Sequence, residues 1–151
     1  MDEKKKRKIS FGHEAIKFSR EIPEPPPPDF ISLFKSMRQW LISICDSEHP
    51  HKTISEYCFL LYETQGNVLI GLVGYNSYVD HDTEIIQIDF KPSHVFFELP
   101  KNEYRDLSNE EVKKRILNEL IEFIGTSGFQ NSFLAKAESI TTNFAGKIWP
   151  L

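Results

Sequence analysis

Apolar residues recur at helical spacing in two stretches of the chain. In the first stretch these residues are Phe30, Leu33, Phe34, Met37, Trp40, Leu41, Ile44 and Cys45. Asp29 precedes them, and Asp is favourable as an N-cap residue, so we expect a helix to begin there. A spacing of three and four residues places these side chains on one helical face, which is expected to cover a sheet.

The second helical stretch follows Leu107. Ser108 and Glu111 have the spacing of a capping box, in which each residue bonds to the backbone of the other. The apolar face consists of Val112, Ile116, Leu117, Leu120, Ile121, Phe123 and Ile124. Gly125 and Gly128 are expected to end this helix.

Between the two helices the pattern is typical of strands. "ISEYCFLLYE" and "NVLIGLVGYNSY" flank "TQGN", which favours a tight hairpin. "TEIIQIDF" and "HVFFELP" predict a third and a fourth strand, and connections this short favour antiparallel pairing. In the first strand apolar residues occupy successive positions, so both faces of the sheet are expected to be apolar.

The sequence therefore predicts an α+β fold with a mainly antiparallel sheet. A four-stranded meander is flanked by two main helices. Phe133 to Ala137 predict a short helical turn, and "SITTNF" with "KIW" predict a possible C-terminal strand. The expected core residues from the two helices are Phe34, Met37, Trp40, Leu41, Leu117, Leu120 and Phe123.

Residues 1–28 differ in composition from the remaining chain. They contain the basic cluster "KKKRK" and five prolines between Pro23 and Pro28. Proline lacks a backbone N–H, so we expect an extended arm that is dispensable for folding. Residues 29–151 are expected to form a single α+β domain, because 151 residues is a usual length for one domain.

Apolar runs and cysteines indicate the compartment. No run approaches the roughly 18 to 20 apolar residues that span a bilayer, so no membrane partner and a cytoplasmic location are expected. Cys45 and Cys58 are the two cysteines, and both lie among apolar residues. In a reducing compartment they are expected to be buried thiols rather than a disulfide.

Charge is distributed unevenly along the chain. The formal net charge is −4, yet the first eight residues carry five cationic side chains against Asp2 and Glu3. From Thr53 to Phe90 there is no Lys or Arg, while six acidic residues fall in that span. Such a segment repels phosphate backbones, so nucleic acid is an improbable partner and a basic protein is favoured.

The stretch Asp80-His81-Asp82 concentrates candidate chemistry in one turn. Carboxylates beside a histidine can orient it as a general base. A nucleophile, an oxyanion site or a set of metal ligands has no recognisable pattern in the sequence, and His49 with His51 lacks a third ligand. We therefore expect no catalytic residue, no metal and no cofactor. The predicted partner-binding residues are Tyr75, Tyr78, Asp80, His81, Asp82 and Glu84.

The order of elements, the acidic meander and the closing "FLAKAESITTNFAGKIWPL" make residues 29–151 similar to small bacterial immunity proteins. The strand pairs "YCFLLYE" with "LIGLVGYNSY", and "IDFKPSHVFFELP", share in this resemblance. These proteins are the antitoxin partners of polymorphic or contact-dependent toxins. The resemblance implies a monomer or weak dimer that binds and neutralises one cognate toxin domain, for instance a basic nuclease.

Two other functions stay open at this point. A small hydrolase or a metal-dependent enzyme would use the Asp80-His81-Asp82 region and would need a pocket with convergent polar groups. An adaptor would instead bind through the basic, proline-rich arm, and its binding would be lost when residues 1–28 are removed.

Overall fold

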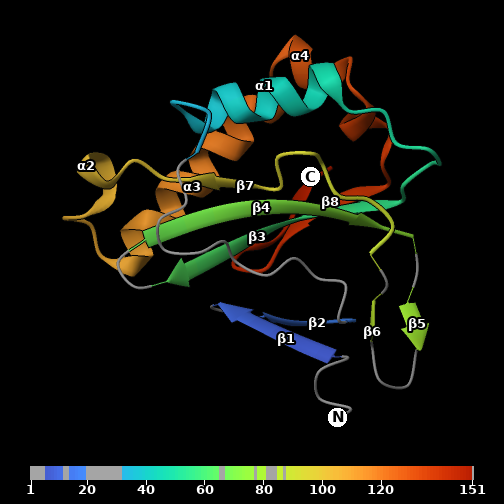
Figure 1. The fold of residues 1–151 in the computed structure, drawn as a ribbon, viewed down its shortest axis with the longest axis horizontal. Helices are drawn as coiled ribbons and strands as arrows, with labels where there is room; N and C mark the ends of the chain where they lie inside the picture. Colours follow the sequence, from blue (N-terminus) through green and yellow to red (C-terminus); the bar gives the residue numbers. More distant parts are fainter. Residues whose placement is uncertain are drawn as a thin grey trace.

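A computed structural model of the 151-residue chain describes residues 6–11, 14–19, 32–64, 67–76, 78–80, 85–86 and 88–150. In residues 6–11, 14–19, 64, 78–80 and 85–86 it describes the backbone alone. Two sheets and a layer of helices make up this part of the chain (Figure 1). The predicted α+β class is confirmed.

Two main helices lie on one face of the larger sheet, as predicted (Figure 1). The first, α1 (Met37–Ser47), begins later than the sequence suggested, because Ser36 rather than Asp29 caps it by accepting a hydrogen bond from the Gln39 backbone N–H at 3.2 Å. The short elements are α2 (Lys101–Tyr104), α4 (Ser127–Gln130) and the 3₁₀ helix η2 (Phe133–Lys136).

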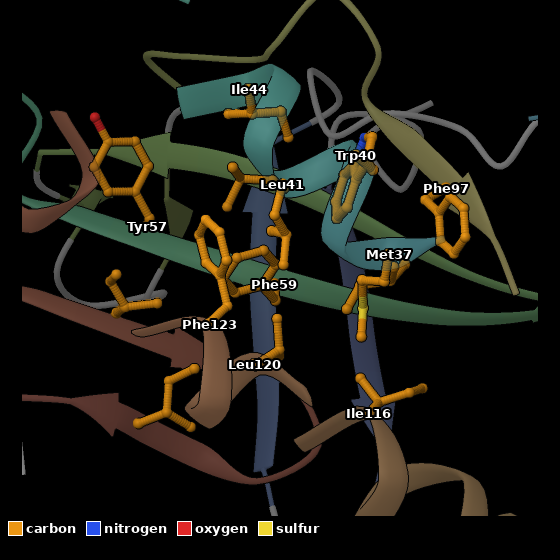
Figure 2. Close-up of a cluster of buried hydrophobic side chains, with 14 of the residues drawn as sticks. Met37, Trp40, Leu41, Ile44, Tyr57, Phe59, Phe97, Ile116, Leu120 and Phe123 are labelled. Atoms are coloured by element: carbon orange, nitrogen blue, oxygen red, sulfur yellow. The ribbon is translucent and has the colours of Figure 1, made fainter. Parts of the chain in front are cut away.

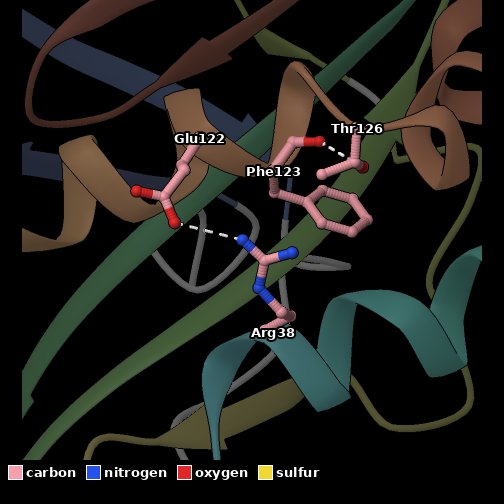
Figure 3. A network of polar contacts seen from close by, with 4 residues as sticks. All are labelled: Arg38, Glu122, Phe123 and Thr126. Carbon is pink, nitrogen blue, oxygen red and sulfur yellow. Dashed lines mark hydrogen bonds and ion pairs between the residues drawn. The ribbon is translucent and has the colours of Figure 1, made fainter.

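The second main helix, α3 (Asn109–Ile124), begins at the predicted capping box. Ser108 and Glu111 bond reciprocally, which satisfies two N–H groups that the helix start leaves unpaired. Near its C-terminal end, Glu122 forms an ion pair of 3.1 Å with Arg38 of α1 (Figure 3). In the same figure the Thr126 hydroxyl donates to the Phe123 carbonyl at 2.7 Å, just after the helix ends.

The larger sheet has five strands in the order β7-β4-β3-β8-β9. The central pair is the predicted antiparallel hairpin. The sheet is mainly antiparallel, as predicted, and its one parallel pair among the described strands is β3 with β8. The strands are β3 (Glu56–Thr64), β4 (Asn67–Tyr75), β7 (Phe96–Glu98), β8 (Ser139–Thr142) and β9 (Gly146–Trp149). The β8–β9 turn contains Gly146 at φ 71°, a backbone conformation that favours glycine.

Four further strands form a second sheet in the order β1-β2-β6-β5. This corrects the expected meander, because the predicted third strand joins this sheet instead of lying between β4 and β7. It also corrects the expected extended arm, because residues 6–11 and 14–19 pair as antiparallel strands in which Ile9 lies opposite Ile16. The prolines from Pro23 to Pro28 lie outside the described residues. The strands are β1 (Lys6–Phe11), β2 (Glu14–Ser19), β5 (Tyr78–Asp80) and β6 (Ile85–Ile86).

The larger sheet buries apolar side chains on both faces, as predicted. On the helix face, Figure 2 shows residues of α1 and α3 gathered around Phe59. Of the predicted core residues, Met37, Trp40, Leu41, Leu120 and Phe123 are buried, and Phe34 and Leu117 are partly buried against them. On the opposite face lies a smaller cluster: Cys58, Leu60, Tyr62, Leu69, Val73, Tyr75 and Ile88.

Asn143 extends the ladder beyond the end of β8. Its side chain is fully buried, accepts from the Leu61 N–H at 2.8 Å and donates to the Leu61 carbonyl at 3.4 Å. An amide side chain thereby replaces the backbone partner that β3 lacks at this point. Within the described residues, no helix combines the length and the apolar character needed to cross a membrane.

Candidate functional site

The predicted partner-binding residues are divided between the two sheets. Tyr78 and Asp80 lie in β5, which is described by its backbone alone. His81, Asp82 and Glu84 lie outside the described residues, so their role stays a prediction. Cys45 and Cys58 are free thiols, half-buried and buried respectively, as expected.

Tyr75 is the predicted contact residue whose side chain the structure describes, and it is buried. Its exposed fraction is 6%, and it belongs to the smaller cluster on the face away from the helices. Burial first, and then the neighbouring Cys58 and the carboxylate of Glu56, raise the pKa of the Tyr75 phenol well above its usual range. Glu56 also accepts a hydrogen bond of 2.8 Å from the Ser139 hydroxyl. This ring is therefore part of the interior, not an exposed anchor.

The cation-free span includes Asp89, which forms an ion pair. Because the span contains no Lys or Arg, a carboxylate in it can pair only with a cation from outside, and Lys52, one residue before the span, approaches Asp89 at 2.9 Å. The second oxygen of Asp89 accepts from the Asn76 N–H at 2.9 Å, and the Asn76 side chain accepts from the Ser55 N–H at 2.6 Å. This series of polar contacts connects the loop between α1 and β3 to the end of β4.

Beside these contacts lies a pocket of about 330 Å³, which we call the Tyr57 pocket. It opens where the loop after α1 reaches β3, near the 3₁₀ helix η2. Its lining combines cationic and histidine side chains with an apolar floor and contains no carboxylate. The lining residues are Pro50, His51, Lys52, Thr53, Ile54, Tyr57, Phe133 and Lys136.

The two aromatic rings of the pocket lining, Tyr57 and Phe133, pack edge-to-face with each other and with Phe90, which lies outside the lining. Tyr57 lies 5.8 Å from Phe90 and 5.7 Å from Phe133, and the latter two rings are 5.6 Å apart. Gly74 allows this packing, because a Cβ there would approach Ile54 to 2.8 Å and the Tyr57 ring to 3.0 Å. The floor therefore depends on a glycine in a central strand.

The hydroxyl of Tyr57 has no hydrogen-bond partner among the described residues. The side chain is 1% exposed, and Figure 2 shows its hydroxyl directed away from Phe59 and Phe123. Burial raises the pKa of this phenol well above its usual range, so the hydroxyl stays protonated and can donate. Because Tyr57 lines a pocket, a ligand or water can accept from its hydroxyl.

The lining of the Tyr57 pocket is suited to one chemical kind of ligand. It presents two ammonium groups, an imidazole and a phenolic donor above apolar rings, which suits an anionic group. Across the described ranges, no cluster of three or more His, Cys, Asp or Glu residues has metal-binding geometry. His49 and His51 are both exposed.

Sequence reasoning missed the Tyr57 pocket because its residues are dispersed. Lys52 lies in the loop between α1 and β3, whereas Lys136 ends η2 much later in the chain. Parallel pairing of β3 with β8 brings these two regions together. Gly74 within an apolar strand was a signal for close approach to that strand. That glycine did not indicate that the ring of Tyr57 is the group that packs against it.

Comparisons with protein-family models, curated protein sequences and solved structures returned no match to this chain.

Proposed function

We propose that the chain is a non-enzymatic binding protein that neutralises a cognate toxin domain, as immunity proteins do. Its contact surface is the acidic excursion, defined here as residues 76–88, between β4 and the return of the chain at Asp89. This excursion contains Asp80, Asp82 and Glu84 and no Lys or Arg. A basic toxin domain, such as a nuclease, would be attracted to it over a distance.

The anchoring of the acidic excursion at both ends carries this proposal. Gly74 and Phe90 exchange backbone hydrogen bonds of 2.9 and 3.1 Å, and the Asp89 N–H donates to the Gly74 carbonyl at 2.8 Å. Beyond the end of β4, the Asn76 N–H donates to the Asp89 carboxylate. A segment whose two ends are held on a sheet has less conformational freedom to lose on binding.

The test is binding kinetics against the product of the neighbouring gene at two salt concentrations. Reversing Asp80 and Asp82 to Lys should slow association several-fold and weaken its salt dependence, because rim charges mainly act on the association rate. Tyr78→Ala should cost at least about 2 kcal/mol of binding free energy if this ring is a central anchor. We expect little change in stability from the charge reversals.

A matched control reverses two acidic residues far from the excursion. Asp106 and Glu110 are highly exposed and lie near the start of α3, at the opposite end of the fold from β5 (Figure 1). Their change to Lys alters net charge equally and should affect association much less. If both pairs of charge reversals slow association equally, the association rate depends on net charge alone and not on the position of the excursion. Unchanged rates in the Asp80/Asp82 variant would remove the excursion from the interface, and turnover that is lost in His81→Asn would favour an enzyme.

A further inference from the structure

The Tyr57 pocket differs in chemistry from the acidic excursion, although both lie near the end of β4. The pocket is on the helix face of the sheet, and none of its lining residues belongs to residues 76–88. A basic toxin surface has no complementarity with its lysines. The pocket therefore needs an explanation beyond toxin binding.

We propose that the Tyr57 pocket binds a small organic anion that carries its carboxylate or phosphate on an aromatic or short apolar body. This site goes beyond the proposed function and does not depend on it. The anionic group would lie at the cationic rim, and its body would rest on the aromatic floor.

The hydroxyl of Tyr57 supplies the directional contact. The Tyr57 side chain lines the pocket, and no described residue accepts the proton of its hydroxyl. At the pocket this hydroxyl can donate to a ligand oxygen in place of water. Hydrogen bonds to charged acceptors are the stronger kind, so the hydroxyl favours an anionic oxygen over a neutral one.

The rim supplies the charge. Lys52 is ion-paired with Asp89, which compensates part of its charge. Lys136 is exposed and forms no ion pair with any residue in the described part of the chain. With no carboxylate in the lining, the pocket has an excess of positive charge. Lys136 is therefore the cation most available to an incoming anion.

The floor and the size of the pocket limit the body of the ligand. Phe133 and Tyr57 offer ring surfaces, and Ile54 adds an apolar side chain. A volume of about 330 Å³ lies at the small end of the range for ligand pockets, so a single ring with one anionic group is an appropriate size. Larger ligands such as dinucleotides are too long for it.

The experiment is an NMR titration of the full chain with phenyl phosphate and benzoate. Inorganic phosphate tests the anion without a body, and benzyl alcohol tests the body without an anion. We expect saturable binding of an aryl anion with millimolar affinity or better, as for a probe of about 11 non-hydrogen atoms. Both partial probes should bind at least about tenfold more weakly. The ratio of phenyl phosphate to benzoate affinity identifies the preferred anion.

Three variants locate the binding. Tyr57→Phe should weaken aryl-anion binding about tenfold through loss of the donor. Lys136→Met should weaken it about fivefold, whereas the matched control Lys101→Met, on α2, should leave it unchanged within about twofold. Lack of saturable binding at about 10 mM would overturn the proposal. So would unchanged affinity in both pocket variants, or inorganic phosphate binding as tightly as phenyl phosphate.

Discussion

Tyr57 and Tyr75 lie at the same end of the larger sheet but on opposite faces, and their hydroxyls have different environments. Both rings are buried, at 1% and 6% exposure. Tyr75 lies close to Glu56 and Thr141, so its hydroxyl is part of a polar cluster within the smaller apolar cluster. Tyr57 belongs to the larger cluster, yet its hydroxyl lines a pocket and has no partner among the described residues.

The alternation of side chains along β3 produces this difference. Tyr57, Phe59 and Leu61 face the helices, whereas Glu56, Cys58 and Leu60 face the other way. Helices α1 and α3 cover the helix face, but the loop after α1 leaves the Tyr57 pocket open at one end. Two similar residues at one end of the sheet thus have different surroundings: Tyr75 belongs to the interior, and Tyr57 lines the pocket for which we propose an anionic ligand.

The largest expected effect concerns the helix face. Leu120 is 1% exposed within the larger cluster, so Leu120→Ala should lower the free energy of unfolding by about 2 to 5 kcal/mol through lost apolar contacts and a new cavity. The neighbouring Ile121 is 43% exposed, and Ile121→Ala is the matched control, expected within about 0.5 kcal/mol. Urea unfolding measures both. Equal losses in the two variants would contradict the assignment of the α3 face.

A smaller effect is expected on the opposite face when residues 1–28 are deleted. Figure 1 shows β1 and β2 on the side of the sheet away from the helices, where Cys58 is fully buried. In a Cys45→Ser background, we expect the Cys58 thiol to be unreactive in the full chain and reactive after the deletion. The melting temperature should fall by only a few degrees, since the larger cluster is retained.

Two outcomes of this deletion would change the account. A Cys58 thiol that stays unreactive after the deletion would mean that other parts of the chain shield the smaller cluster. A loss of cooperative unfolding would mean that the N-terminal hairpin is required for the fold, contrary to the expectation from the proline content of residues 1–28.

Features encoded by neighbouring residues were predictable from the sequence. The capping box at Ser108 and Glu111, the β3–β4 hairpin and the turn at η2 all depend on contacts within a few residues. The predicted start of α1 was wrong, because the apolar spacing continues before Ser36. The hydrogen bond from the Gln39 N–H to the Ser36 side chain determines where the helix begins. Hydrophobic periodicity shows which face is buried, but it does not give the helix end.

Features that depend on distant segments were not predictable. The transfer of β6 to a second sheet and the parallel pairing of β8 with β3 join segments far apart in the sequence. The candidate sites show the same limit. The acidic residues of the excursion lie within five positions of the sequence, at 80, 82 and 84. The Tyr57 pocket, in contrast, brings Lys52, Tyr57 and Lys136 together only after β8 has paired.

The central claim is that the Tyr57 hydroxyl serves binding while the Tyr75 hydroxyl serves stability. The most direct test is urea unfolding of Tyr57→Phe and Tyr75→Phe, each with and without saturating phenyl phosphate. Without the probe, Tyr57→Phe should stay within about 0.5 kcal/mol of the parent protein, and Tyr75→Phe should lose about 1 to 3 kcal/mol. A bound ligand stabilises the folded state, so the probe should stabilise the parent and Tyr75→Phe alike, and Tyr57→Phe much less. Equal stabilisation of all three proteins, or a larger intrinsic loss in Tyr57→Phe than in Tyr75→Phe, would contradict the account.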